Sequence, residues 1–474
     1  MIKTKIIATL GPSCSNSDII KAMTDNGVDV FRLNFSHGTL EEHGKLLESL
    51  NTARSQHHHT TAVLGDLCGP KIRTNRIEPD GDELHTGEKI TIVQGSEVGT
   101  AKRFGTNYEH FNKDIAIGHR IFIDDGRIAL RVISKNDNEV VCEVIIAGVM
   151  RSHKGINLPD TQISIPSITK RDWQCVDWAI EKKLDFLALS FVRSADEIKQ
   201  LKDYIRKAGA NIKIVAKIET PQVLKHLEDV IKASDAILVA RGDLGVEMDL
   251  AEVPLIQKRI TQLCRRFGKP VVVATQMLQS MIDSPVATRA EVSDVANAIM
   301  DLTDAVMLSG ETAVGKYPVK AAQTIQRIAS VTEAYLDQNE LIRPKTITTD
   351  DLALTASVAH NAGQIADDIG AKLVAVWSQT GSSARLLSKA RIGVPILAFS
   401  SDQRTCHQMC LDYGVIPRCQ PIPVDIESFT GMVDRLILNR NWANIGEKIV
   451  LVAGQPLGTA SATNAIIVHT ITND

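Results

Sequence analysis

The sequence predicts an α/β protein made of a (β/α)8 TIM-type barrel, a small all-β domain inserted into that barrel, and a three-layer α/β domain at the C-terminal end. Three observations predict this architecture. Eight short apolar runs alternate with helical patterns, a long segment with strand-like alternation interrupts them, and new runs follow a polar linker. Repeated strand–helix alternation is typical of this barrel, because each parallel strand needs a crossover before the next one begins.

Each of the eight runs is short and apolar, as expected for strands buried on both faces of a parallel sheet. Helical patterns separate most of them. The helical segment before the eighth run opens with a capping box formed by Thr288 and Glu291. The runs begin at Thr4, Asp29, Thr61, Asp185, Ile212, Ala236, Val271 and Ala305.

The connection between the third and fourth runs has a different pattern. Segments such as "EKITIVQGS" alternate apolar and polar residues, and turn sequences occur at Asp125-Gly126 and at residues 136–138. This predicts an all-β domain inserted in a βα loop. Such loops lie at the C-terminal face of the barrel, where active sites form, so the insertion is well placed to act as a lid.

A polar linker, "NELIRPKTITTDD", precedes the last part of the chain. Four further runs follow it, "KLVAVWS", "PILAFS", "KIVLVAG" and "NAIIVHTI", again separated by helical patterns. We expect residues 1–69 and 166–343 to form the barrel, residues 70–165 the inserted domain, and residues 344–474 a C-terminal regulatory domain.

Composition argues against nucleic acid and membrane partners. The 474 residues carry 53 Lys and Arg against 56 Asp and Glu, a net charge of −3, which sets up no field to attract nucleic acid or an acidic membrane. No apolar run approaches the roughly 18 residues of a membrane helix, and the first residues show no signal-peptide pattern. We therefore expect a cytoplasmic protein whose eight scattered cysteines are reduced.

Polar side chains end most of the predicted barrel strands. In "KIVAKIETPQ", Lys217 and Glu219 lie two residues apart, and therefore on one face of the strand. Charged groups are rarely buried unless they are paired or used. Because the strands end at one mouth of the barrel, we expect these side chains to converge there. The residues are Arg32, Asn34, Ser36, Asp66, Lys217, Glu219, Asp243, Thr275, Ser309 and Glu311.

These residue types suit one kind of chemistry. Glu219 and Asp243, on adjacent strands, supply hard oxygen ligands for Mg²⁺ and leave other positions for substrate and water. Lys217 and Arg32 can bind phosphate. The segment "RGDLG", from residue 241, is expected to be a strand-to-loop turn whose N–H groups hold a carboxylate. Such a site favours phosphoryl transfer, or stabilisation of an enolate.

Eight motifs, in their order and spacing, resemble those of the pyruvate kinases over essentially the whole chain. The resemblance implies transfer of a phosphoryl group from phosphoenolpyruvate to ADP, giving pyruvate and ATP in the last step of glycolysis, by a homotetramer. The motifs are "RLNFSHG", "GDLCGPKIRT", "KGINLP", "AKIE", "ARGDLGVE", "ATQMLQSM", "TRAEVSDVANA" and "DAVMLSGETAVGKYP".

The resemblance also implies roles for the matching residues at the reacting centre. Glu219 and Asp243 would hold Mg²⁺ (or Mn²⁺), and Lys217 would stabilise charge on the phosphoryl group and the enolate oxygen. Arg32 and Arg73 would bind phosphoryl oxygens. The remaining implied substrate contacts are the backbone amides of Gly242 and Asp243 for the carboxylate, and Thr275 near the methylene, with Ser309 and Glu311 behind it.

Two further subsites are implied by the same resemblance. The nucleotide side would comprise Asn34, His37, Arg73 and Lys154. A monovalent-cation site would comprise Asn34, Ser36, Asp66 and the carbonyl of Leu67.

Two alternatives share part of this site. A Mg²⁺-dependent lyase or aldolase acting through a pyruvate enolate would use the carboxylate pair and an Arg, but would need neither the inserted domain nor "KGINLP". A catalytically silent barrel that binds metabolites through its C-terminal domain would be expected to lack at least one of four residues. All four, Lys217, Glu219, Asp243 and Arg32, are present.

A candidate effector site lies in the C-terminal domain. "WSQTGSSARLLSKA" places Ser378, Thr380, Ser382 and Ser383 between a strand and a helix, where hydroxyls and free N–H groups suit a phosphate. The loop 454–464, which contains Gly458, could close over a ligand but has no basic side chain. We therefore expect a sugar monophosphate or AMP rather than a bisphosphate; an ordinary Ser/Thr-rich helix cap is the alternative.

One motif departs from the family pattern. Residue 71 is Lys where potassium-requiring members typically carry Glu, and residue 67 is Leu where they typically carry Thr. A Lys ammonium brings its own positive charge, so a nearby K⁺ would be repelled. We expect potassium not to be required, unless Lys71 is only a solvated residue at the lid hinge.

Overall fold

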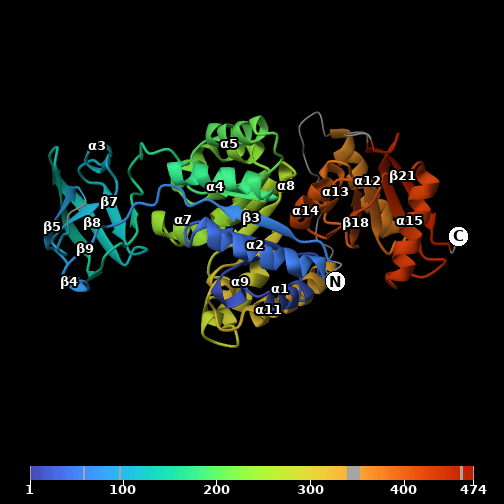
Figure 1. The fold of residues 1–474 in the computed structure, drawn as a ribbon, viewed down its shortest axis with the longest axis horizontal. Coiled ribbons are helices and arrows are strands. Elements are labelled where there is room, and N and C mark those ends of the chain that lie inside the picture. Colours follow the sequence, from blue (N-terminus) through green and yellow to red (C-terminus); the bar gives the residue numbers. More distant parts are fainter. Residues whose placement is uncertain (1, 57–58, 96–97, 339–352, 459–462, 473–474) are drawn as a thin grey trace.

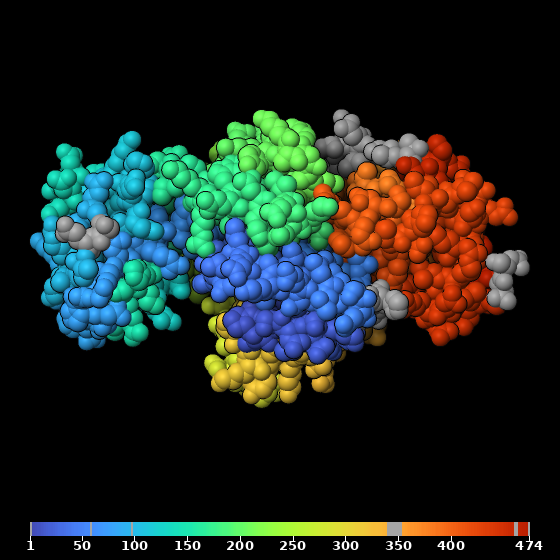
Figure 2. Space-filling view, in the orientation of Figure 1, coloured from blue at the N-terminus to red at the C-terminus, as the bar shows by residue number. Residues whose placement is uncertain are grey.

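The computed structural model describes residues 2–56, 59–95, 98–338, 353–458 and 463–472. Figure 1 shows three parts in a row: the inserted domain at one end, the barrel in the middle and the C-terminal domain at the other end. Figure 2 shows the same row as a continuous surface. The predicted linker, residues 339–351, lies outside the described residues. No helix within the described ranges is long and apolar enough to span a membrane.

Eight parallel strands form a closed barrel, as predicted. Their order around the barrel is β1-β16-β15-β14-β13-β12-β3-β2. Their side chains are almost entirely buried, because helices cover the outside and side chains fill the inside. The strands are β1 (Lys5–Thr9), β2 (Val28–Asn34), β3 (Ala62–Asp66), β12 (Phe186–Leu189), β13 (Lys213–Ile218), β14 (Ala236–Ala240), β15 (Val271–Ala274) and β16 (Ala305–Leu308).

Several of the covering helices begin at N-terminal capping boxes. Thr39, Thr169 and Thr288 each form a capping box, and the last of these confirms the predicted box with Glu291. The helices are α1 (Ser17–Asp25), α2 (Leu40–Ser55), α4 (Lys170–Glu181), α5 (Ala195–Lys207), α6 (Leu227–Ala233), α7 (Arg241–Glu247), α8 (Val253–Arg266), α9 (Arg289–Met300), α10 (Gly310–Ala313) and α11 (Pro318–Gln338), with 3-10 turns η1 (Pro12–Cys14), η2 (Pro221–His226) and η3 (Gln279–Ile282).

The segment between β3 and β12 forms a β structure with its own core. Its main sheet has the order β11-β7-β8-β9-β5-β6, and β10 pairs with β4. Phe104, Tyr108 and Phe111 are among the largest fully buried side chains. The elements are β4 (Asp82–Leu84), β5 (Lys89–Gln94), β6 (Arg103–Thr106), α3 (Phe111–Asp114), β7 (Arg120–Ile123), β8 (Ile128–Lys135), β9 (Glu139–Ile146), β10 (Gly148–Met150) and β11 (Ile156–Asn157).

The C-terminal domain has three layers, with a five-stranded sheet of order β19-β18-β17-β20-β21 between two apolar clusters. We expected four strands and missed β19. Its sequence, VIPRC, contains Pro417, which cannot donate to a ladder and is tolerated because β19 is an edge strand. The elements are α12 (Ala353–Asp368), β17 (Val374–Trp377), α13 (Ser382–Lys389), β18 (Ile396–Ser400), α14 (Gln403–Gln408), η5 (Met409–Leu411), β19 (Val415–Cys419), α15 (Ile426–Asn439), β20 (Lys448–Gly454) and β21 (Thr463–Thr470).

A buried ion cluster joins the C-terminal domain to the barrel. Asp304, which has no exposed surface, accepts a hydrogen bond from the backbone N–H of Val271 at 2.7 Å. The same carboxylate forms ion pairs with Lys389 and with Arg391, at 3.0 Å for the latter. Burial lowers the pKa of Lys389, and its pairing with Asp304 opposes this shift. The end of α13 is therefore fixed to the start of β16.

Asp304→Asn should destabilise the protein by about 2 kcal/mol, because it leaves two buried cations without a carboxylate, although the amide oxygen can still accept the Val271 N–H. The midpoint of urea-induced unfolding measures this. Lys316→Met, which removes an exposed ion pair with Asp283, is the matched control and should change stability by less than about 0.5 kcal/mol. An equal midpoint shift in the two variants would contradict the role of the buried cluster.

Candidate active site

The polar strand ends meet at the C-terminal mouth of the barrel through a chain of buried contacts. Arg32 Nη2 lies 2.7 Å from Asp66 Oδ2, and Arg32 Nη1 donates to Thr9 Oγ1 at 2.9 Å. Lys217 Nζ lies 3.3 Å from the other oxygen of Asp66 and 2.8 Å from Glu219 Oε1. The predicted proximity of Lys217 and Glu219 is therefore present.

These contacts hold the groups in their charged forms. Burial alone would lower the pKa of Lys217, but the carboxylates of Asp66 and Glu219 outweigh it and raise the pKa above its ordinary value. Burial likewise acts to raise the pKa of Asp66, and Lys217 and Arg32 reverse this and lower it. A protonated, nearly buried lysine therefore faces the mouth.

Glu219 and Asp243 form a pair of like charges beside this lysine. Burial, followed by repulsion from Glu219, raises the pKa of Asp243 to about 6, against the opposing effects of Lys217 and Lys71. Glu219 is 1% exposed, and its Oε2 accepts the backbone N–H of Phe191 at 2.7 Å. A carboxylate whose pKa is raised by a neighbouring carboxylate, as that of Asp243 is by Glu219, fits a site for a divalent cation. The described residues contain no cluster of three or more His, Cys, Asp or Glu ligands, so the remaining ligands would come from substrate and water.

Thr275 has a strained backbone at the end of β15. Its φ of 72° is unusual for a β-branched residue, and such conformations concentrate at functional sites. Its hydroxyl accepts the backbone N–H of Gly242 at 2.8 Å and donates to the Ala274 carbonyl at 2.6 Å. Arg241 Nη2 donates to the Thr275 carbonyl at 2.9 Å. The surrounding groups thus fix both the backbone and the hydroxyl.

The segment from Arg241 differs from our prediction. We expected a strand-to-loop turn, but α7 begins directly after β14. Arg241 Nη1 donates to Asp294 at 2.6 Å, in addition to its bonds with the carbonyls of Ala274 and Thr275. These contacts set the chain direction at the strand end, where the helix starts.

Glu311 holds two loops together behind Thr275. The residue is 1% exposed, and its Oε1 accepts the N–H of Leu278 at 3.0 Å. Its Oε2 accepts the N–H of Ser309 at 2.7 Å. Both carboxylate oxygens are therefore engaged with backbone, which makes Glu311 a positioning residue for the ends of β15 and β16.

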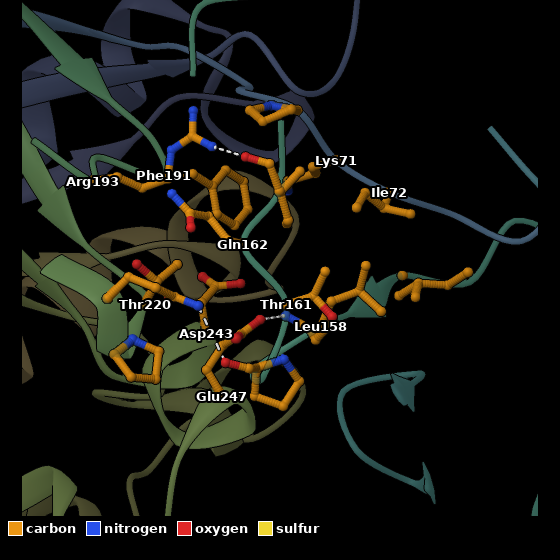
Figure 3. Close-up of a pocket in the computed structure, with 18 of the residues that line it drawn as sticks. Lys71, Ile72, Leu158, Thr161, Gln162, Phe191, Arg193, Thr220, Asp243 and Glu247 are labelled. Atoms are coloured by element: carbon orange, nitrogen blue, oxygen red, sulfur yellow. Dashed lines mark hydrogen bonds between the residues drawn. The ribbon is translucent and has the colours of Figure 1, made fainter. Parts of the chain in front are cut away.

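A cleft of about 1120 Å³ opens between the barrel mouth and the inserted domain (Figure 3). Lys71 and Arg73 line it, and Asp243 and Glu247 lie on its barrel side. Lys154 also lines it and pairs with Asp124 at 2.9 Å. The cleft is large enough for substrates the size of a nucleotide.

The cations of the cleft gather around His37. Burial lowers the pKa of His37, and Lys71, Arg73 and Arg32 lower it further. His37 is therefore neutral near pH 7, and the surrounding positive charge suits a polyphosphate.

The comparisons with known proteins agree with this site. Family models described as "Pyruvate kinase, barrel domain" and "Pyruvate kinase, alpha/beta domain" match residues 1–322 and 356–469. The chain belongs to the pyruvate kinase family. The predicted resemblance and fold class are thereby confirmed.

Individual relatives match over nearly the full length. The pyruvate kinase of Mycobacterium tuberculosis is 37% identical over 470 residues, covering 99% of this chain and 98% of that one. That of Thermococcus litoralis is 38% identical over 479 residues, covering 99% and 98%. The crystal structure of a pyruvate kinase from Cryptosporidium parvum superposes with a TM-score of 0.91 at 32% identity, covering 99% of this chain and 96% of that chain.

The residues predicted for a monovalent cation lie at the ends of β2 and β3 and directly after them. Asn34 and Asp66 are register partners on these strands, and Asn34 Oδ1 accepts the N–H of Ser36 at 3.2 Å. The Leu67 carbonyl already accepts a hydrogen bond from Ser190 Oγ at 2.7 Å. One of the four expected cation ligands is therefore engaged by a protein hydroxyl.

Sequence reasoning missed Ser190 at the end of the fourth barrel strand. Lys217 Nζ donates to Ser190 Oγ at 2.7 Å, so this hydroxyl connects the lysine to the Leu67 carbonyl. The available signal was the same as for the other strands, a polar residue directly after an apolar run. An uncharged hydroxyl is common at strand ends, so the signal was weak.

The candidate effector residues lie around the start of α13. Gly381 has a φ of 79°, a conformation that favours glycine. Ser378 Oγ accepts the N–H of Ala384 at 3.3 Å, and Thr380 Oγ1 donates to Ser382 Oγ at 3.1 Å. Ser383 forms a hydrogen bond with Thr463, across the loop that contains Gly458. Residues 459–462 of this loop lie outside the described residues.

Glu247 joins α7 to the inserted domain. Its Oε1 accepts a hydrogen bond from Asn157 Nδ2 at 2.8 Å. Burial raises the pKa of Glu247 to about 7 against the effect of this bond, and Asp243 and Asp160 raise it further. Because the folded pKa is above the unfolded value, folding favours the protonated carboxyl, and this stability is lost as the pH rises through about 7.

Glu247→Gln should therefore raise the melting temperature, and by more at about pH 8.5 than at about pH 5.5, since the amide oxygen still accepts from Asn157. The gain at high pH should be at most about 3 kcal/mol. Glu109→Gln, an exposed site in the inserted domain, makes the same charge change and should show no such pH dependence. A pH-independent gain in Glu247→Gln would contradict this account.

Proposed function

We propose that this protein catalyses transfer of the phosphoryl group of phosphoenolpyruvate to ADP, giving pyruvate and ATP. The observation that carries the proposal is the buried, protonated Lys217 beside the Glu219–Asp243 pair, facing a cleft that contains Arg73 and Lys154. Family membership and relatives named as pyruvate kinases support it. The reaction is the last step of glycolysis, and we propose a cytoplasmic location.

The first half of the proposed reaction is phosphoryl transfer, in which different residues have different roles. Lys217, Arg32 and Arg73 would bind the phosphoryl oxygens and stabilise their charge while the bond to the enol oxygen breaks and the bond to ADP forms. Glu219 and Asp243 would hold Mg²⁺ (or Mn²⁺), which when bound adds positive charge at the same oxygens. The backbone N–H groups of Gly242 and Asp243 would face the substrate carboxylate; the former now donates to Thr275.

The second half of the reaction is proton transfer to carbon. The enolate left by phosphoryl transfer must gain a proton at its methylene to become pyruvate. Thr275 is a poor acid, so we propose that its fixed hydroxyl positions a water for this step. Ser309 and Glu311 would act behind it, with Glu311 holding the loops rather than touching substrate.

A coupled assay with phosphoenolpyruvate, ADP and Mg²⁺ tests the proposal. Pyruvate and ATP should appear together in equal amounts. A lyase or aldolase would form or break a carbon–carbon bond without making ATP, and a silent barrel would make neither product. Either result would contradict the proposed function.

We further propose the subsites and divisions that the family resemblance implies. Asn34, His37, Arg73 and Lys154 would bind the nucleotide, and Lys71 would replace the potassium ion that Asn34, Ser36, Asp66 and Leu67 bind in other members. The proposed domain limits are 1–69 with 166–343, 70–165 and 344–474. The proposed assembly is a homotetramer, which sedimentation equilibrium would test.

A phosphorylated activator is proposed for the loop 378–383 of the C-terminal domain. Its hydroxyls and the start of α13 suit one phosphate, and the facing loop around Gly458 has no basic side chain for a second one. Sugar monophosphates or AMP should therefore lower the phosphoenolpyruvate concentration needed for half-maximal rate. Activation by fructose 1,6-bisphosphate alone, with no monophosphate effect, would contradict this.

A further inference from the structure

A second group of cations lies at the opposite end of the barrel from the mouth. A pocket of about 30 Å³, which we call the interface pocket, separates the N-terminal ends of β12 to β15 from the C-terminal domain. In Figure 1, α13 and α14 are the elements of the C-terminal domain nearest the barrel. The residues used below are Lys213 and Asp235 from the barrel, and Arg385, Thr405, Gln408 and Asp412 from the C-terminal domain.

Two cations of the interface pocket have no direct partner in the part of the chain that the structure describes. Arg385 Nε is buried and makes no hydrogen bond. Within the described residues, neither the Arg385 guanidinium nor Lys213 Nζ forms an ion pair. Asp235, one of the two acids at the pocket, is already engaged, because it pairs with Lys202 at 2.9 Å and accepts the N–H of Ile214 at 2.8 Å.

The surrounding charges show an excess of positive charge. Burial lowers the pKa of Lys213, and Arg385 and Lys202 lower it further against the effect of Asp235. Burial and then Arg385 lower the pKa of Lys269, beside the pocket, to about 8. Cations that disfavour one another in this way are costly to bury unless an anion lies between them.

Asp412 is the second acid of the interface pocket. It is 5% exposed, and burial raises its pKa to about 7, against the effects of Arg385 and Lys389. Its carboxyl is therefore partly neutral near pH 7 and compensates the cations only in part. When protonated, it can donate a hydrogen bond to an anion.

The other polar side chains at the pocket are already engaged. Thr405 Oγ1 donates to Asp402 Oδ2 at 2.9 Å, and Gln408 Nε2 donates to the Asn211 carbonyl at 2.9 Å. The free donors are therefore the guanidinium of Arg385 and the ammonium of Lys213. The planar guanidinium of Arg385, with its paired N–H donors, and the compact ammonium of Lys213 together suit a tetrahedral oxyanion. The volume is suited to one such group rather than to a whole nucleotide or sugar.

We propose that the interface pocket is an oxyanion site that binds one phosphate group between Arg385 and Lys213. The phosphate belongs either to inorganic phosphate or to a phosphomonoester whose remainder lies outside the pocket. The site differs from the catalytic one, because Lys213 begins β13 and Lys217 lies about 13 Å further along that strand. It does not depend on the proposed activity or on the effector role of Ser382 and Ser383.

The test uses the full-length chain with Lys217→Met, so that phosphate binding at the mouth is weakened. Crystals soaked in selenate, a tetrahedral anion with an anomalous signal, should show selenium between Arg385 and Lys213. Calorimetric titration should show that the chain binds inorganic phosphate. A second substitution, Arg385→Gln, should lower the phosphate affinity at least about tenfold, because a charge-assisted hydrogen bond is lost. Titration with glycerol 3-phosphate separates the two sources: tighter binding than inorganic phosphate assigns the phosphomonoester, and equal or weaker binding assigns the free ion.

Controls keep the outcome interpretable. Arg435→Gln, at an exposed position on α15, removes the same charge and should leave binding unchanged. In the wild-type background, Arg385→Gln should keep kcat within about twofold, since Arg385 is remote from the mouth. If Arg385→Gln fails to fold, Lys213→Gln serves instead and should show the same loss. Selenium only at the mouth or beside Ser382 and Ser383, or phosphate binding unchanged in the folded variant, would overturn the proposal.

Discussion

Lys217→Met should lower kcat by at least about a thousandfold, equivalent to about 4 kcal/mol of transition-state stabilisation. Lys217 Nζ contacts Glu219 at 2.8 Å and Ser190 at 2.7 Å, and its pKa is raised, so it carries a full positive charge at the mouth. Methionine keeps the length and packing of the side chain but removes that charge. Because the charge acts most strongly on the transferring phosphoryl group, kcat should fall much more than KM changes.

The same strand provides a matched control. Lys213 lies at the other end of β13, away from the mouth, so Lys213→Met makes the same change in charge and shape outside the catalytic site. Its kcat should stay within about twofold of the wild type. Circular dichroism and melting temperature would check that both variants fold. A kcat for Lys217→Met within about tenfold of the wild type would remove Lys217 from the proposed site.

The barrel could be predicted because its signal is local and repeated. Each strand is a short run buried on both faces, so its composition alone marks it, as with "KIIAT" of β1 and "AILVA" of β14. The edge strand β19 was missed, because Pro417 and Arg418 break that composition and only its place at the sheet edge accommodates them. Strands could therefore be predicted from composition where they are fully buried, but not where their position at a sheet edge permits other residues.

The helix α7 shows the limit of local reasoning. Its first residues, "RGDLG", contain two glycines and are typical of a loop. What sets the chain direction there is Arg241, which bonds to the Ala274 carbonyl and to Asp294, both far away in the sequence. Such contacts exist only after the barrel has closed.

In the candidate site too, some residues could be predicted from the sequence and others could not. The charged strand ends could be identified because a buried Lys, Glu or Asp is costly unless it is paired or binds a ligand. The geometry of a barrel also brings strand ends together. Their partners could not be identified. The bond from Ser190 to Leu67 and the two backbone groups held by Glu311 depend on how neighbouring loops pack, which no residue spacing records.

Lys71→Glu should create a potassium requirement, and its rate without potassium should be at least about a hundredfold below the wild type. Lys71 is exposed at the cleft, and its charge lowers the pKa of both Asp243 and His37. It therefore acts on the positions where substrate phosphates are proposed to lie. Replacing it with Glu changes the local charge by two units, and each unit is worth about 2 kcal/mol at roughly 7 Å with an effective dielectric constant of about 20.

A bound potassium ion would restore part of that charge. Asn34, Ser36 and Asp66 would supply oxygen ligands for it. Of the expected ligands, Asp66 also pairs with Arg32 and Lys217, and the Leu67 carbonyl accepts from Ser190. Adding about 100 mM KCl at matched ionic strength should therefore raise the rate of the variant at least about tenfold, because screening is held constant. The wild type should be nearly fully active in sodium- and potassium-free buffer with tetramethylammonium as the cation.

The matched control is Lys102→Glu, an exposed change of the same size in the inserted domain, where Lys102 pairs with Glu88 away from the cleft. It should remain potassium-independent and keep its rate, since its charge is far from the substrate and is screened by salt. If potassium raises the wild-type rate more than about tenfold, a Lys71 ammonium does not stand in for the ion. If Lys71→Glu is slow but potassium does not rescue it, Lys71 contributes charge to the cleft without replacing a cation, and the proposed equivalence is wrong.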